Sequence, residues 1–158
     1  MATFYISTTG NDTTGNGSLS SPWKTLFKAT STVSSIGDII HVNAGTYTET
    51  QQCNLKVGVN LEGDGMASTI IKSSLTGDWS NLLSLESGSV TNGNQTISGI
   101  TFDGQYVSES SFKTWVGIWV TLRNNVVIKD CSIINFYDRG AIFNGNGNNS
   151  STIGRAHV

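Results

Sequence analysis

The chain has 158 residues, of which 37% are hydrophobic and only 13% are charged, and its formal net charge at pH 7 is −2. A chain of this length can bury a sizeable core, and its near-neutral charge gives no electrostatic footprint for nucleic acid or for an anionic membrane. No apolar run approaches the roughly 20 residues that span a bilayer, so no membrane span is expected.

The two cysteines have no partner at the spacing of a zinc site. Cys53 and Cys131 each lie among apolar residues, which favours two buried thiols, although a disulfide stays open. The segment Met1–Gly10 has neither the basic nor the apolar region of a signal peptide. The localisation is therefore open: extracellular or cell-surface if a signal peptide was removed, and otherwise intracellular or phage-associated.

The N-terminal part predicts one strand, a polar loop and one helix. The strand is Thr3–Ser7, and a Gly-rich polar loop follows it. Ser21 before Pro22 is typical of a helix start, and the apolar residues after it recur at helical spacing. The helix is expected to end near Gly37. Residues 1–36 are thus predicted to form a strand, a loop and a capping helix.

Beyond Gly37 the pattern changes to short strands separated by turns rich in Gly, Asn, Asp and Ser. Glu62–Gly65 is one of the predicted turns. The predicted strands are Ile39–Val42, a piece that starts at Tyr47, Val57–Leu61, Thr69–Lys72, Leu82–Leu85, Thr96–Phe102, Val116–Leu122, Val126–Ile134 and Ala141–Phe143.

These strands repeat. Three apolar sets share the spacing i, i+3, i+5, and they are Ile97-Ile100-Phe102, Ile128-Cys131-Ile133 and Ile153-Ala156-Val158. A second series aligns Gly117–Val120 with a similar later segment, Gly140–Phe143. Periods in the twenties suit one turn of a β-helix, whose coils are stable only when stacked on their neighbours. The first set and the second set lie further apart in the sequence than the second and the third. The polar segment Asp103–Thr114 explains this, because it is expected to leave the coil as a loop.

Several segments resemble the pectate-lyase-like right-handed β-helix proteins. The N-terminal likeness lies in Phe4–Asp12, Ser21–Leu26, Gly37–Val42 and Gly45–Glu49, and the coil likeness lies in Ile97–Gly104 and Val126–Phe136. The resemblance implies an all-β, right-handed parallel β-helix that occupies residues 1–158 as a single domain, with residues 37–158 as coils. It is specific for fold and weak for function, because this superfamily includes lyases, glycoside hydrolases, epimerases, phage tailspikes and surface proteins without known activity.

The C-terminal end departs from that family. Its members usually have more coils, whereas Val158 falls within a predicted strand, without the terminal cap that solenoids use. The C-terminal end is therefore expected to be uncapped. Either the chain is a fragment, or another copy covers its last coil in a homo-oligomer.

Charged residues of the coils are candidates for carbohydrate chemistry. Cleavage of a polysaccharide needs paired carboxylates, or a basic residue beside a Ca²⁺-binding acidic cluster. The candidates are Asp103, Asp138 and Arg139, although Asp103 also suits a turn and Asp138–Arg139 a local ion pair. The sequence has neither an Asp–Asp pair nor a dense acidic cluster, so no cofactor is expected, Ca²⁺ is unsupported and catalysis stays open. His41 is expected at a surface position of its strand.

The alternation in Trp115–Leu122 predicts two outward tryptophans. Val116, Ile118, Val120 and Leu122 should face the core, and Trp115 and Trp119 the outside, with Leu82 continuing their stripe on the coil before. The repeat places Trp119 beside Ile142 and Trp115 beside Asp138. Such a stripe marks a binding surface. The stripe could bind a glycan or another copy of the chain. Alternatively, the Asp103–Thr114 loop could cover it through Tyr106 and Phe112.

Two functions follow as hypotheses. The first is a polysaccharide-binding or polysaccharide-processing β-helix, with its site at Trp115, Trp119, Asp138, Arg139, Tyr106 and Asp103. The second is a non-catalytic structural or assembly module, such as a surface or phage-fibre component, that self-associates through its open end.

Overall fold

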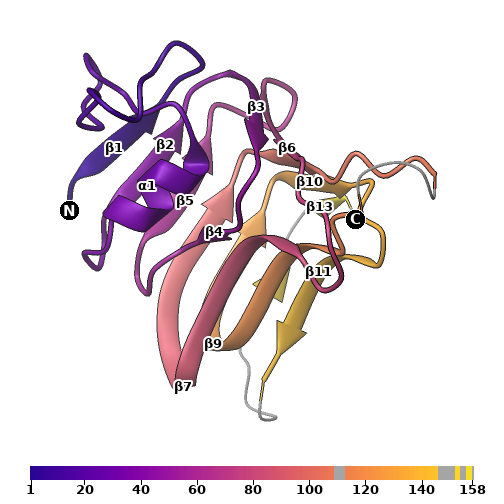
Figure 1. The fold of residues 1–158 in the computed structure, drawn as a ribbon. Helices are drawn as coiled ribbons and strands as arrows, with labels where there is room; N and C mark the ends of the chain where they lie inside the picture. Colours follow the sequence, from indigo (N-terminus) through magenta and orange to yellow (C-terminus); the bar gives the residue numbers. More distant parts are fainter. Residues whose placement is uncertain (109–112, 146–151, 154–155, 158) are drawn as a thin grey trace.

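The computed structural model describes residues 1–108, 113–145, 152–153 and 156–157 (Figure 1). Its helix α1 is Leu26–Thr32. Its strands are β1 (Thr3–Ile6), β2 (Ile39–Val42), β3 (Gly45–Glu49), β4 (Cys53–Asn54), β5 (Asn60–Gly63), β6 (Thr69–Ser73), β7 (Asn81–Ser98), β8 (Thr101–Asp103), β9 (Val116–Lys129), β10 (Cys131–Ile134), β11 (Arg139–Asn144), β12 (Thr152–Ile153) and β13 (Ala156–His157). No helix in the described ranges has the length and hydropathy that a membrane crossing requires.

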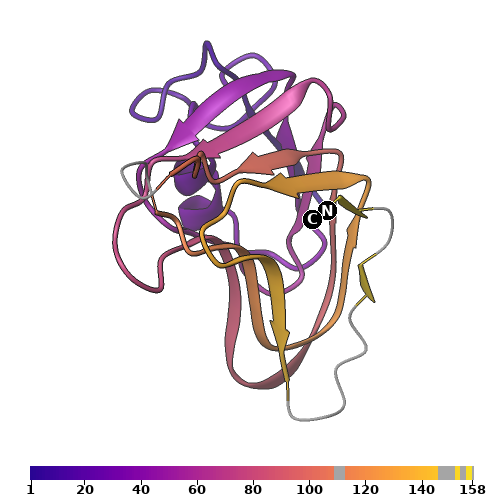
Figure 2. The same ribbon diagram turned by 90° about the vertical axis from the view of Figure 1, so that its right-hand side faces the viewer.

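The strands form two parallel sheets that wind round a common core (Figures 1 and 2). The first sheet has the order β1-β2-β5-β7-β9-β11, with β4 paired to β7 and β12 to β9. The long strands β7 and β9 bend, so that their first halves pair with β4 and β11 and their second halves with β5 and β12. The second sheet, β3-β6-β8-β10-β13, makes the third side of each coil. This cycle of three sides is the predicted right-handed parallel β-helix.

The register confirms the repeat that the sequence indicates. Ile97 pairs with Ile128, and Ile128 pairs with Ile153. Phe102 pairs with Ile133 on the third side, where Cys131 also pairs with Ala156. Val158 lies outside the described residues. The two segments of the second series also pair, since Ile118 lies beside Ala141 and Trp119 beside Ile142.

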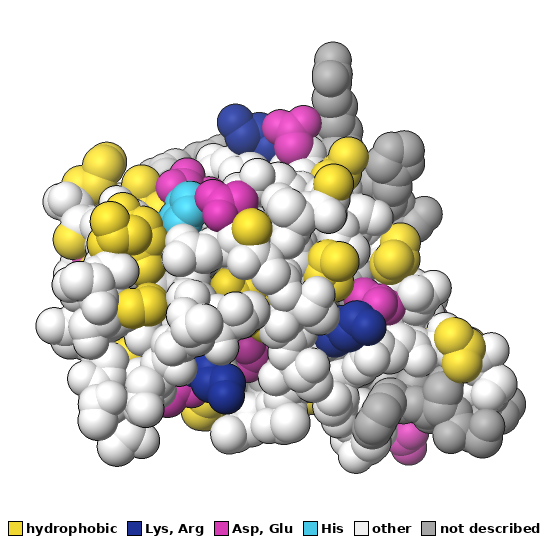
Figure 3. Space-filling view, turned by 90° about the horizontal axis from the view of Figure 1, so that it is seen from above, with side chains coloured by type: hydrophobic (Ala, Val, Ile, Leu, Met, Phe, Trp, Pro, Cys, Tyr) yellow, Lys and Arg dark blue, Asp and Glu magenta, His cyan; other side chains and the backbone are white. Residues whose placement is uncertain are grey.

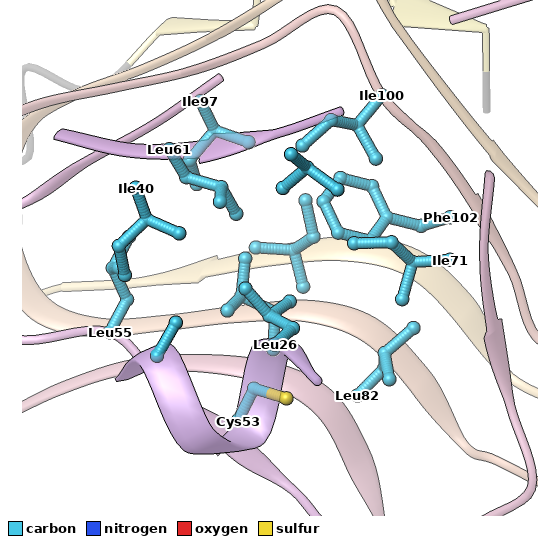
Figure 4. Close-up of a cluster of buried hydrophobic side chains, with 14 of the residues drawn as sticks. Leu26, Ile40, Cys53, Leu55, Leu61, Ile71, Leu82, Ile97, Ile100 and Phe102 are labelled. Carbon is cyan, nitrogen blue, oxygen red and sulfur yellow. The ribbon is translucent and has the colours of Figure 1, made fainter. Parts of the chain in front are cut away.

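The core is a column of aliphatic side chains supplied in turn by each coil (Figure 4). Ile40, Leu61, Ile97 and Ile128 occupy successive positions of one ladder, and each is fully buried. Removing such columns of apolar surface from water supplies the main driving force of a solenoid, because one coil alone has no second layer to pack against. Cys53 and Cys131 are buried free thiols, which resolves the alternative of a disulfide.

The predicted helix start was wrong, because α1 begins at Leu26 and not after Ser21. Ser21 instead closes a turn, since its N–H donates to Ser18 O, and Trp23 forms a parallel bridge to Ile6. Thr25 is the N-cap, and its side chain accepts from the Lys28 N–H. The helix also ends early, at Thr32, with Val33 as the C-cap.

A buried carboxylate completes the start of α1. Glu49, at the end of β3, accepts from the backbone N–H groups of Leu26 and Phe27 at 2.7 and 3.2 Å. These groups belong to the first turn, where a helix has no acceptors of its own. The side chain of Glu49 is 1% exposed, and burial raises the pKa of this carboxyl, partly offset by the two backbone hydrogen bonds. A residue from the first coil therefore fixes the capping helix in place.

Three local expectations are corrected. Glu62 and Gly63 belong to strand β5 and not to a turn. Leu82 is fully buried and so does not continue an outward stripe. Leu122 is only half-buried, because its φ of 54° breaks the alternation of β9 where that strand bends. The next residue, Arg123, takes the buried position instead.

Candidate functional site

Aromatic side chains gather where the loops before β7, β9 and β11 meet. We call Trp79, Tyr106, Trp115 and Tyr137 the aromatic patch. The rings of Trp79 and Trp115 are stacked, with centroids 4.9 Å apart and an interplanar angle of 26°. Tyr137 contacts Trp115 at 5.1 Å and meets Tyr106 edge-on at 5.2 Å. These separations are those of favourable aromatic pairs, which support one another beyond their buried area.

The exposed face of the patch belongs mainly to Trp79. Its side chain is 69% exposed, and Tyr137 is 36% exposed, while Trp115 is half-buried beneath them. The backbone φ of Trp79 is +63°, a left-handed conformation that non-glycine residues adopt rarely. A strained residue that holds a large apolar ring toward water is a feature typical of binding sites.

Polar groups surround the aromatic rings. The Nζ of Lys113 lies 5.3 Å from the centroid of Tyr137. Asp138 and Arg139 both donate their backbone N–H to Trp115 O, at 3.0 and 3.1 Å, and their side chains form an ion pair at 3.5 Å. The indole Nε1 of Trp115 is buried without a hydrogen-bond partner among the described residues. The patch thus combines flat apolar rings with nearby charged groups and one unused donor.

Asp103 is the last residue of β8, and its side chain supports the turn that follows. Its Oδ1 accepts from Gln105 N and from Asn135 Nδ2, both at 2.9 Å. Asn135 O in turn accepts from the backbone N–H of Tyr106 at 2.9 Å. This network fixes the start of the loop that carries Tyr106, which is the role that a turn aspartate performs.

The structure separates the two predicted tryptophans. Trp119 is half-buried on the outer face of β9, between Ser84 and Ile142 of the neighbouring strands. It lies four positions beyond Trp115, about 13 Å along an extended strand. None of the ring contacts of the patch involves Trp119. The predicted alternation holds for Val116, Ile118 and Val120, which are buried, but the outer face has two separate surfaces.

Sequence reasoning missed Trp79 and Tyr137. The register of β7 and β9 places Asn81 beside Val116, which brings the residues just before these strands together. A signal was present in Gly77-Asp78-Trp79-Ser80, where a tryptophan stands among turn residues. The Asp103–Thr114 loop, which was expected to cover the tryptophans, supplies only part of the arrangement. Tyr106 of this loop contacts Tyr137, which in turn contacts Trp115, while Trp79 comes from a different loop. Phe112 lies outside the described residues.

A second polar cluster lies on the outer face of β2 and β5, where Figure 3 shows a histidine between acidic side chains. His41 Nδ1 is 3.1 Å from Glu62 Oε1, and its Nε2 is 3.0 Å from Asp64 Oδ1. The ring of Tyr5 packs beside it at 5.4 Å. Both ring nitrogens are thus engaged by carboxylates, which orients the imidazole as a cross-strand ladder residue. His41 occupies the surface strand position that the sequence predicts.

No group of three or more His, Cys, Asp or Glu in the described ranges could hold a metal ion.

The coils, capping helix and parallel sheets define the class: this is a parallel β-helix protein with a pectate-lyase-like fold. Residues 8–155 match the family described as "Protein of unknown function (DUF1565)", and the chain belongs to that family. A comparison with the curated proteins finds no match.

Solved structures share the fold. A rhamnogalacturonan lyase is 18% identical, with a TM-score of 0.64 over 92% of this chain and 38% of the lyase. A pectin methylesterase in complex with a hexasaccharide is 16% identical, with a TM-score of 0.63 over 97% of this chain and 48% of the esterase. ORF18 of Geobacillus virus E2 is 21% identical, with a TM-score of 0.61 over 73% of this chain and 23% of that protein. The chain spans less than half the length of each, and the likeness extends to the fold alone.

Proposed function

We propose that this β-helix binds polysaccharide through the aromatic patch. The observation that carries the proposal is the exposed Trp79 ring stacked on Trp115, because the C–H faces of sugar rings pack on indoles. Asp138 and Arg139 supply hydrogen-bonding groups at the edge of the platform. Support also comes from the solved structures, which include a rhamnogalacturonan lyase and a pectin methylesterase with a bound hexasaccharide.

The proposal concerns binding and assigns no bond cleavage. Among the predicted site residues, Asp103 is engaged in turn hydrogen bonds and Asp138 in an ion pair with Arg139. Neither contact equips a carboxylate for general acid chemistry, which needs a proton held near the scissile bond. Trp119 belongs to a separate surface. A long polymer bound at the patch would contact it by extending along β9.

Trp79→Ala is expected to weaken polysaccharide binding roughly 10-fold or more, as truncation of an aromatic hot spot does. Because the ring is 69% exposed, the fold should keep its thermal stability. Isothermal titration with polygalacturonate, rhamnogalacturonan and a neutral glucan measures the effect. Val90→Ser, which removes another exposed apolar side chain, serves as the matched control and should leave binding unchanged. Unaltered affinity in Trp79→Ala, or no binding by the wild-type chain, would refute the proposal.

We propose self-association as a second function, on the observation that β11 is the last strand in its sheet order within the part of the chain that the structure describes. The side chains of Ala141, Ile142 and Phe143 on this strand are only half-buried. An edge strand of this kind presents unpaired backbone groups and apolar surface, which a second copy of the chain can cover.

Ile142→Lys tests the second proposal, since a charge on an edge strand opposes pairing. The wild-type chain is expected to sediment as a concentration-dependent dimer or larger species, and Ile142→Lys as a monomer. Val90→Lys adds the same charge to an exposed position elsewhere and should not change the sedimentation. A wild-type chain that stays monomeric at high concentration would exclude assembly through β11.

A further inference from the structure

A pocket lies beside strand β3, which stands at the N-terminal end of the second sheet (Figure 1). Its volume is about 260 Å³. One wall is β3 itself, and the other comes from residues just after β1 and just before α1. Among the described residues, the lining consists of Thr8, Lys24, Thr25, Thr46, Tyr47 and Thr48. None of these belongs to the aromatic patch.

Strand β3 is hydrogen-bonded on one side. It pairs with β6 and is the last strand in its sheet order within the described part of the chain. Gly45 donates its N–H to Ser68 O at 2.8 Å, which shows that its backbone groups face β6. Because the side on which a strand residue bonds alternates along a parallel ladder, Thr46 and Thr48 direct their backbone groups away from β6. These two residues therefore form the free edge of β3.

The free edge carries two donors and two acceptors in alternation, which are the N–H and C=O groups of Thr46 and Thr48. In the part of the chain that the structure describes, no second strand and no loop forms a backbone hydrogen bond with them. Both residues are exposed, so the edge is open to solvent. Donors and acceptors spaced in this way, about 6.6 Å from one residue to the next but one, match another extended polypeptide.

The rest of the pocket is held in place by its own contacts. The Oη of Tyr47, a residue that is 5% exposed, donates to Asn43 O at 2.7 Å. On the opposite wall, Thr25 Oγ1 donates to Asp12 Oδ2 at 2.7 Å. Thr8 lies close to the start of β3, since a Cβ on Gly45 would stand 2.5 Å from Thr8 Cγ2. A ligand thus meets walls that are already ordered, which lowers the entropic cost of binding.

Lys24 supplies the charge of this lining. It is exposed and is the one charged residue among the described residues that line the pocket. Its ammonium forms no ion pair within 4.0 Å in the described ranges, and the contact with Asp12 is made by the backbone N–H of Lys24. An exposed lysine attracts a carboxylate modestly and repels a cation. The lining therefore favours an acidic ligand over a basic one.

We propose that β3 binds an acidic peptide in an extended conformation, by addition of a strand to its free edge. The N–H and C=O groups of the peptide pair with those of Thr46 and Thr48, and a carboxylate of the peptide lies beside Lys24. Strand addition of this kind obtains affinity from main-chain hydrogen bonds and specificity from the neighbouring side chains. The site is separate from the aromatic patch and does not depend on the polysaccharide proposed there.

Amide hydrogen exchange of the whole chain tests the proposal. The probe is an acetylated and amidated peptide of alternating valine and threonine with one central glutamate. The amides of Thr46 and Thr48 should exchange rapidly in the free chain and become protected as the peptide saturates, whereas Tyr47 should be protected throughout. The same peptide with methylated backbone nitrogens should give no protection, and a lysine in place of its glutamate should weaken binding.

Three results would overturn the proposal. The first is an unchanged exchange rate at Thr46 and Thr48, and the second is equal protection by the methylated peptide. The third is protection that appears with rising concentration of the chain alone, because a second copy would then occupy the edge. Neither the probe nor its methylated form alters the fold, so these results hold even if a variant of β3 is unstable.

Variants of the edge separate its backbone from its side chains. Thr48→Pro removes one donor at a position where an edge strand tolerates proline, and it should weaken peptide binding roughly 10-fold. Thr48→Val keeps the N–H and should leave the affinity unchanged. Lys24→Gln should weaken binding by about 3-fold, while Lys129→Gln, at an exposed position of β9, should have no effect. Full affinity in Thr48→Pro, or equal losses in the two lysine variants, would contradict strand addition beside Lys24.

Discussion

Gly99→Ala is expected to lower the free energy of unfolding by about 3 kcal/mol, as the sum of left-handed strain and overpacking. Gly99 has a φ of +71° at the corner between β7 and β8. A Cβ at this position would lie 2.5 Å from the carbonyl oxygen of Gly63 in the preceding coil. Backbone cannot move aside as a flexible side chain can, so the two coils would have to separate at this corner.

Urea unfolding followed by circular dichroism measures the effect, and Asp130→Gly is the matched control. Asp130 occupies the same corner one coil later, since Ser98 pairs with Lys129, and its φ is +51°. Its side chain is exposed, so Asp130→Gly should change stability by less than about 1 kcal/mol. Equal stability of Gly99→Ala and the wild-type chain would show that the coils tolerate a wider spacing.

Glu49→Ala is expected to destabilise the chain by about 3 kcal/mol, because it leaves the Leu26 and Phe27 N–H groups without acceptors in a buried place. Glu49→Gln keeps one acceptor oxygen and should lose about half as much. Glu86→Gln, at an exposed position of β7, is the control and should be close to neutral. Thermal and urea unfolding give the comparison, and a Glu49→Ala chain as stable as the wild type would contradict the role of this carboxylate.

The same carboxyl gives a pH dependence with a defined sign. Burial raises the pKa of Glu49 in the folded chain, so the folded state binds the proton more tightly than the unfolded state. The stability associated with this group is therefore complete below the ordinary Glu pKa of about 4.3 and is lost as the pH rises through the raised value. The difference in the free energy of unfolding between the wild-type chain and Glu49→Gln should shrink over that pH interval. A difference that grows with pH would contradict a raised pKa of Glu49 in the folded chain.

The sequence predicted only part of the aromatic patch and none of its geometry. Trp115 and Tyr106 stand out in the sequence, and the structure links them through Tyr137. Trp79, the most exposed ring of the patch, was missed because it lies in a loop and has no periodic pattern to mark it. Trp119 shares the alternation of Trp115, yet its register with Ser84 and Ile142 gives it different neighbours.

The sequence by itself determined the coil repeat. The ladder through Ile97, Ile128 and Ile153 was readable because parallel stacking demands an apolar residue at the same place in every coil. Local propensity also fixed short strands such as Ile39–Val42, whose bounds agree with β2. These features depend on neighbours in sequence or on a strict period.

Only the tertiary structure decided the features that join distant segments. The helix start moved from Ser21 to Leu26 because Trp23 is bound to the strand at Ile6 and Glu49 caps the first turn from another coil. The aromatic patch and the hydrogen bonds of Arg123 likewise bring together loops and strands that lie far apart in the sequence. No local pattern encodes such contacts, since the free energy that fixes them comes from burial and hydrogen bonding between coils rather than from propensity within one coil.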